Sequence, residues 1–317
     1  MRILLVILAL VAIQAQAPPD TEVFLAPLST AGGKLTVGPP VNISNSPGYD
    51  NQPSFLPDGS AILFTSARSR VVSAPVEGVP APAAQMDIYR YDLGSKRVTQ
   101  VTDTLLSEYS PTVTPDGRHI SVIRVEEDGT QRLWRFTIDG KQPSVILEGV
   151  KPVGYHAWLD EYRVALFILG ERPKPATLQV ADTRTGKVDM VAEDIGQSIQ
   201  RMPGGGISFV QREAGAAGTP GSFVLKQLRI GPAPDGRPYV VETLVPAMSG
   251  ANAPHVGWAP DGTLLTAHAG KLHAWRRGSG DWTVVADLDA AGLRNVTRLA
   301  LSPKGDYIAL VAARAER

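Results

Sequence analysis

The chain has 317 residues, 43% of them hydrophobic and 20% charged, and its 31 Lys and Arg balance its 31 Asp and Glu. Zero net charge with no basic stripe argues against nucleic-acid binding, which needs clustered cations. The absence of cysteine excludes disulfides, cysteine-ligated zinc and thiol catalysis.

The first 17 residues have the pattern of a secretory signal peptide. Arg2 is followed by an apolar run from Ile3 to Ile13 and then by Ala15-Gln16-Ala17. The run is too short to span a bilayer, which takes about 20 apolar residues, and we predict cleavage near Ala15 or Ala17. An uncleaved anchor is the alternative. No later segment is apolar enough to span a membrane, so we expect a periplasmic or secreted protein.

A Pro-Asp-Gly phrase then recurs along the chain and divides it into repeats. It reads PSFLPDG from residue 53 and PTVTPDG from residue 111, and degenerate copies put the repeat anchors at residues 57, 115, 159, 203, 260 and 303. Pro, Asp and Gly suit successive positions of a type I turn. Pro234-Asp235-Gly236 falls out of phase, and we interpret it as a turn between later strands of one repeat.

Each repeat is predicted to be a four-stranded antiparallel meander. Alternating apolar stretches flank each anchor, and pairs such as IYRYDLGSKRVTQVT follow, with a Gly-containing turn between them. Such a meander cannot bury both faces alone, so the repeats must pack around an axis.

The last repeat contains only two strands after Pro303, and residues 21 to 44 match its missing pair. The sequence therefore predicts an all-β, six-bladed β-propeller with four-stranded blades, closed by N-terminal clasp strands, in a single domain at residues 21–317. Blades one to five are expected at about residues 49–102, 107–149, 152–193, 196–245 and 253–290, and blade six at about 294–317 plus 21–44.

The repeats resemble those of the TolB-type, WD-repeat-like propellers of bacterial envelope proteins. YDNQPSFLPDGSAILFTS with DIYRYDL downstream, and EYSPTVTPDGRHISV, carry the resemblance, which covers roughly residues 21 to 317. TolB has a further α/β domain before its propeller, for which this sequence shows no counterpart. The resemblance supports an envelope protein that binds a protein, peptide or polymer. We expect this protein to be a monomer.

Polar residues at the starts of the first strands are predicted to crowd the central opening and bind a ligand there. They are Asp50, Asn51, Gln52, Glu108, Tyr109, His156, Gln200, His255 and Arg298. The alternative is that they are polar only because the channel holds water. The same face is expected to carry long insertions, ARSRVVSAPVEGVPAPAAQ, GERPKPA and REAGAAGTPGS, either as a binding face or as tolerated decoration.

No cofactor is expected, and the sequence offers two candidate sets of metal ligands. Asp50, Asn51 and Glu108 offer oxygen ligands of the kind that Ca²⁺ takes. His255, His268 and His273 offer imidazoles for zinc or copper, but without a spacing motif.

The sequence thus favours a non-enzymatic binding module of the cell envelope. No G-x-S-x-G nucleophile motif is present. The alternatives are a metal-dependent hydrolase or lactonase at the channel mouth, by analogy of fold, and a small-molecule sensor whose ligand plugs the channel.

Overall fold

The computed structural model describes residues 19–30, 34–68, 85–215, 221–248 and 253–314, which form strands, turns and loops and no helix. The predicted signal peptide, most of the blade-one insertion and part of the blade-four insertion lie outside these ranges. No helix in the described ranges is long and apolar enough to cross a membrane.

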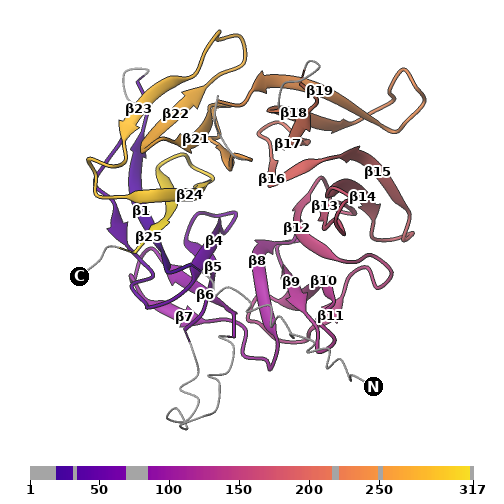
Figure 1. Cartoon of the computed structure of the whole chain (residues 1–317). Coiled ribbons are helices and arrows are strands. Elements are labelled where there is room, and N and C mark those ends of the chain that lie inside the picture. Colours follow the sequence, from indigo (N-terminus) through magenta and orange to yellow (C-terminus); the bar gives the residue numbers. More distant parts are fainter. Residues whose placement is uncertain (1–18, 31–33, 69–84, 216–220, 249–252, 315–317) are drawn as a thin grey trace, which may run out of the picture.

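The strands form six antiparallel sheets arranged as blades around a central axis, with β4, β8, β12, β16 and β24 nearest the centre (Figure 1). Blade one has β4 (Asp50–Phe55), β5 (Ala61–Ser66), β6 (Asp87–Asp92) and β7 (Val98–Gln100). Blade two has β8 (Ser107–Val113), β9 (His119–Val125), β10 (Gln131–Thr137) and β11 (Ser144–Val145). Blade three has β12 (Val153–Trp158), β13 (Arg163–Ile168), β14 (Thr177–Asp182) and β15 (Val188–Glu193).

Blade four has β16 (Ile195–Arg201), β17 (Ile207–Glu213), β18 (Ser222–Ile230) and β19 (Tyr239–Pro246). Blade five has β20 (Val256–Trp258), β21 (Leu264–His268), β22 (Lys271–Trp275) and β23 (Thr283–Asp287). Blade six combines β24 (Arg294–Leu301) and β25 (Tyr307–Ala313) with β1 (Thr21–Ser29), β2 (Thr36–Val37) and β3 (Val41–Asn42). The predicted all-β, six-bladed architecture is confirmed.

The ring is closed by the N-terminal clasp that the repeat count predicts. Strand β1 pairs antiparallel with β25 in a register from Thr21 opposite Ala313 to Pro27 opposite Tyr307. Strands β2 and β3 pair in turn with β1. The two ends of the chain therefore share one sheet, and β1 and β25 lie side by side in Figure 1.

The hydrophobic core is distributed between the blades rather than gathered at the axis. In the described ranges, the buried apolar residues fall into six clusters, and each cluster joins two neighbouring blades. Strand β1 contributes to two of them because its side chains alternate: Val23 and Leu25 face blade one, whereas Ala26 and Leu28 face blade five. Every blade thus depends on both neighbours for burial of its faces.

The repeated turns form between first and second strands for a local reason. The amide of Gly59 donates to the carbonyl of Leu56 at 2.9 Å, and Gly117 donates to Thr114 at the same distance. Both glycines have positive φ, +74° and +69°, which a residue with a Cβ adopts only with strain. The Asp58 carboxylate accepts the Ser60 amide at 2.9 Å. Pro234-Asp235-Gly236 lies between β18 and β19, the later strands of blade four.

Candidate functional site: the central cavity

A cavity of about 560 Å³ lies on the axis and is lined by the first strands of all six blades. At one end of the axis the cavity wall consists of residues such as Gln52, Ser110 and Tyr155, and at the other end it consists of prolines of the repeated turns. The rim prolines are exposed: Pro57, Pro203, Pro260 and Pro303. The cavity therefore opens on the face that carries the turns between first and second strands, opposite the face of the predicted insertions.

Bulges in the first strands bring polar groups into this cavity. Strand β4 shifts register against β5 between Asn51 and Ser54, and Gln52 within the bulge has φ of +57°. The Gln52 side chain lines the cavity, and its Oε1 accepts hydrogen bonds from Thr65 Oγ1 and the Ser110 amide, both at 2.8 Å. This amide side chain therefore joins blade one to blade two at the cavity wall.

His156 is a buried, neutral group of the wall. Burial lowers its pKa to about 3, and the imidazole carries no charge at neutral pH. Ser121 Oγ donates its hydrogen to the Thr112 carbonyl at 3.1 Å. Its oxygen must therefore be the acceptor in the 2.7 Å contact with His156 Nε2, so the His156 ring carries its hydrogen on Nε2. Trp158 Nε1 donates to the same oxygen at 3.0 Å. His156 and Trp158 of blade three are thereby tied to blade two.

Arg298 supplies positive charge to the cavity, together with Arg201. Arg298 Nη2 donates to Tyr155 Oη at 2.7 Å, and its guanidinium lies 4.8 Å from the Tyr155 ring centroid. Within the described ranges, no carboxylate lies within ion-pair distance of Arg298 or Arg201. Burial, reinforced by the nearby Arg298, holds the pKa of His255 well below its usual range, so this wall imidazole is neutral as well.

The cavity wall contains no acidic residue among the described residues. At neutral pH its charges are therefore those of two guanidinium groups, with neutral imidazoles, amides and aromatic rings around them. A concave site with uncompensated arginines favours ligands that carry carboxylates or other anions.

Five of the nine residues that the sequence predicted as ligand-binding line this cavity: Gln52, His156, Gln200, His255 and Arg298. The remaining four lie outside its lining. Asn51 Oδ1 accepts the Gln52 amide at 2.8 Å, and Tyr109 packs against the cluster between blades two and three. Asp50 is 1% exposed beside the clasp, where Thr21 Oγ1 donates to its carbonyl at 3.0 Å. Burial raises the pKa of the Asp50 carboxyl to about 6.

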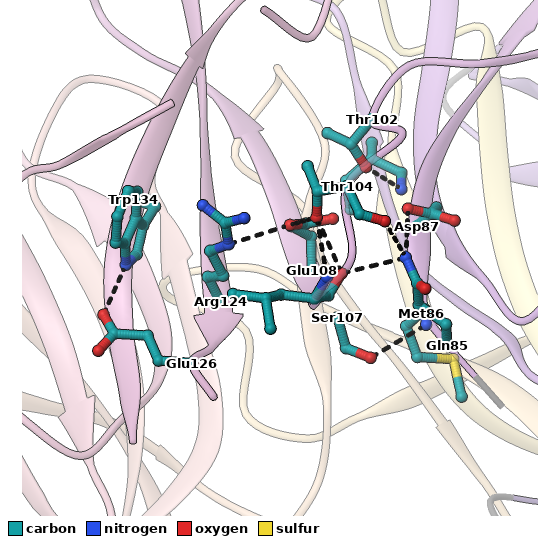
Figure 2. A network of polar contacts seen from close by, with 12 residues as sticks. Gln85, Met86, Asp87, Thr102, Thr104, Ser107, Glu108, Arg124, Glu126 and Trp134 are labelled. Atoms are coloured by element: carbon teal, nitrogen blue, oxygen red, sulfur yellow. Dashed lines mark hydrogen bonds and ion pairs between the residues drawn. The ribbon is translucent and has the colours of Figure 1, made fainter. Parts of the chain in front are cut away.

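Glu108 is fully buried between blades one and two, in the network of Figure 2. Thr104 Oγ1 donates to Glu108 Oε1 at 2.7 Å, and Arg124 Nε lies 3.3 Å from the same oxygen. Burial raises the pKa of Glu108 to about 7, because it outweighs the opposing effects of the Thr104 hydroxyl and the Arg124 guanidinium. The Glu108 amide donates to the Met86 carbonyl at 2.8 Å, so this residue holds two blades together.

Comparison with known proteins agrees with this architecture. No family model and no curated protein matches the sequence. A candidate TolB from Agrobacterium tumefaciens superposes with a TM-score of 0.63 at 16% identity, over 94% of this chain and 99% of that one. TolB from Acinetobacter baumannii gives 0.56 at 12%, over 94% of this chain and 65% of that one. The chain therefore shares the six-bladed propeller fold of these TolB proteins.

The same fold occurs in an oligogalacturonate lyase solved in complex with manganese. It superposes with a TM-score of 0.55 at 12% identity, over 94% of this chain and 92% of that one. At such identities the likeness is one of fold, and residues of the propeller must be judged by their own surroundings.

The candidate metal ligands are not brought together. Asp50 lies beside the clasp, and Glu108 lies between blades one and two. The His268 and His273 rings are 6.2 Å apart, whereas His255 lines the cavity. In the part of the chain that the structure describes, no group of three His, Asp or Glu side chains is placed to hold a metal ion.

Metal removal is expected to leave the thermal unfolding of the propeller unchanged. A metal that binds only the native state raises the melting temperature, and removing it lowers that temperature. The measurement is the metal content of the purified protein, followed by melting curves with and without EDTA and with added Ca²⁺ or Zn²⁺. A stoichiometric metal, with a melting temperature that falls on chelation, would contradict the expectation.

Several cavity residues were not predicted from the sequence, including Tyr155, Gln197 and Trp258. Arg201 was not predicted either, although the repeats carry a signal for it. Arg201 lies two residues before the repeat anchor of blade four, at residue 203. The same position in blades one, two, five and six is apolar: Phe55, Val113, Trp258 and Leu301. A single charged residue at an otherwise apolar repeat position is a usable indication of function.

Proposed function

We propose that the propeller is a non-enzymatic binding module of the cell envelope whose central cavity binds an anionic group, with Arg298 as its main contact. The observation that carries this proposal is the cavity wall: two arginines with no described carboxylate partner, and no acidic residue beside them. The secretory pattern of residues 1 to 17 supports an envelope location.

The geometry suits binding because Arg298 is held in place before any ligand arrives. Its hydrogen bond to Tyr155 Oη and its position over the Tyr155 ring restrict the guanidinium, so less side-chain entropy is lost on binding. Planar guanidinium groups bind carboxylates through paired hydrogen bonds. A carboxylate-bearing ligand is therefore the first to test.

Replacing Arg298 by glutamine is expected to weaken binding of a carboxylate-rich probe such as triglutamate by at least about tenfold, since charge-assisted hydrogen bonds contribute about 1.5–3 kcal/mol. Glutamine keeps a donor for Tyr155 and removes the charge. Titration calorimetry at two salt concentrations measures the effect, because an ionic contact weakens with salt.

The matched control is Arg184→Gln, which removes an exposed arginine paired with Asp182 in blade three. It is expected to bind triglutamate as the wild type does. Equal affinity of Arg298→Gln and wild type, or equal binding of trilysine, would refute the proposal.

A metal-dependent hydrolase or lactonase at the same cavity is the second proposal. A lyase solved with manganese shares the fold, but no group of three His, Asp or Glu side chains in the described ranges is placed to hold a metal ion, so this function ranks second. The two proposals differ in turnover: the binding module returns its ligand unchanged, whereas the enzyme consumes ester or lactone substrates and loses activity with EDTA.

A further inference from the structure

A second cavity, of about 500 Å³, lies on the turn face between blades four and five. Three of its wall residues, Met202, Pro203 and Trp258, also line the central cavity. Trp258 is fixed at this shared wall, since its Nε1 donates to Ser208 Oγ of blade four at 2.8 Å. We refer to this second cavity as the crevice, and it continues the central cavity outward over the turn face.

The crevice contains an arginine whose charge is not balanced. Arg276 forms an ion pair with Asp261, and Arg229 pairs with Glu242 at 3.1 Å. Arg277 instead donates from Nη2 to Gln227 Oε1 at 2.6 Å. Within the described ranges, no carboxylate lies within ion-pair distance of Arg277.

Gln227 holds Arg277 from a buried position. It is 2% exposed on β18, and its Nε2 donates to Glu242 Oε2. A neutral, buried acceptor restricts the Arg277 guanidinium without neutralising it. Arg277 itself is exposed, so its remaining donors are available to a ligand.

The turn of blade four leaves the edge of the crevice open. It reads Pro203-Gly204-Gly205 where blades one, two and five have Pro-Asp-Gly, so it places no carboxylate at the rim. A Cβ added at Gly204 or Gly205 would meet no atom within 4 Å. The backbone at this edge can therefore be approached closely by another chain.

We infer that the crevice is a second anion subsite and that the ligand is an acidic peptide segment, which runs from the central cavity past Trp258 to Arg277. The inference rests on the proposed function of the central cavity. Between the arginines the rim is apolar, with Met202, Trp258 and Pro203. Such a surface suits the apolar side chains of a peptide. It suits a polyuronate such as oligogalacturonate less well, because every unit of that polymer carries hydroxyl groups.

The test compares a short and a long probe on three variants. The short probe is triglutamate. The long probe is a ten-residue peptide of alternating Glu and Leu, which extended spans up to about 33 Å and reaches both cavities. Arg277→Gln is expected to bind the long peptide about tenfold more weakly and triglutamate unchanged, whereas Arg298→Gln weakens both. Arg184→Gln should bind both as the wild type does.

Each result decides between the two subsites. If Arg277→Gln binds the long peptide as tightly as wild type, the crevice subsite is wrong, while dependence of triglutamate on Arg298 would uphold the cavity. Dependence on Arg277 alone would overturn the role of the cavity and keep the crevice. Arg277-dependent binding of oligogalacturonate with no binding of the peptide would overturn the peptide ligand, and failure of all probes at millimolar concentration would overturn both subsites.

Discussion

Replacing Val23 by aspartate is expected to lower the free energy of unfolding by about 4 kcal/mol or more, because it buries a carboxyl without a prepared partner. Val23 has no exposed surface and lies opposite Val311 in the closing sheet. It packs with Ile62 and Phe64 of blade one. The substitution therefore acts on the contact that joins the closing blade to the first blade.

Urea unfolding followed by tryptophan fluorescence measures this effect. Val41→Asp is the matched control, since Val41 lies on β3 of the same clasp and is 61% exposed. It is expected to change stability by no more than about 0.5 kcal/mol. Equal losses in the two variants would mean that β1 does not close the ring as described.

Glu108→Gln is expected to flatten the dependence of stability on pH. The folded pKa of Glu108, about 7, lies above its ordinary value of 4.5. Between these values the folded protein binds more protons than the unfolded chain, so this group's contribution is fully present below pH 4.5 and is lost as pH rises through 7. Wild type should lose about 2–3 kcal/mol more than Glu108→Gln between pH 5 and pH 8.

Urea midpoints across this pH range provide the measurement. Thr104→Val is the informative companion, because it removes the hydroxyl that donates to Glu108 Oε1 and opposes the rise in pKa. It should raise the Glu108 pKa further and shift the loss of stability to higher pH. Parallel curves for wild type and Glu108→Gln would show that Glu108 titrates with an ordinary pKa.

Local interactions explain why the blades could be predicted. The Pro-Asp-Gly turns are closed by a hydrogen bond between residues three apart, such as Gly59 to Leu56. Along β5 four successive apolar residues are all buried, with Ile62 and Phe64 facing blade six and Ala61 and Leu63 facing blade two, as the two-residue period of a strand dictates. The last repeat lacks two strands, and residues 21 to 44 match them, so the clasp could be predicted without knowledge of long-range contacts.

The candidate site was predicted only in part, because strand bulges decide where polar side chains point. Asp50 and Gln52 are two residues apart and were expected at one opening. The register shift after Asn51 and the positive φ of Gln52 direct Gln52 to the cavity, while Asp50 stays buried beside the clasp. A one-residue slip exchanges the two faces of a strand, and no local pattern here predicts the slip.

The sequence by itself determined the repeated blade, the number of blades and the N-terminal clasp that closes the ring, since each depends on local turn chemistry and strand periodicity. Only the tertiary structure decided the charge of the cavity. Arg298 meets Tyr155 across 143 residues, and Arg277 meets Gln227 across 50. The chain as a whole is neutral, but its fold leaves these guanidinium groups at the axis and in the crevice, because blade packing sets which side chains meet.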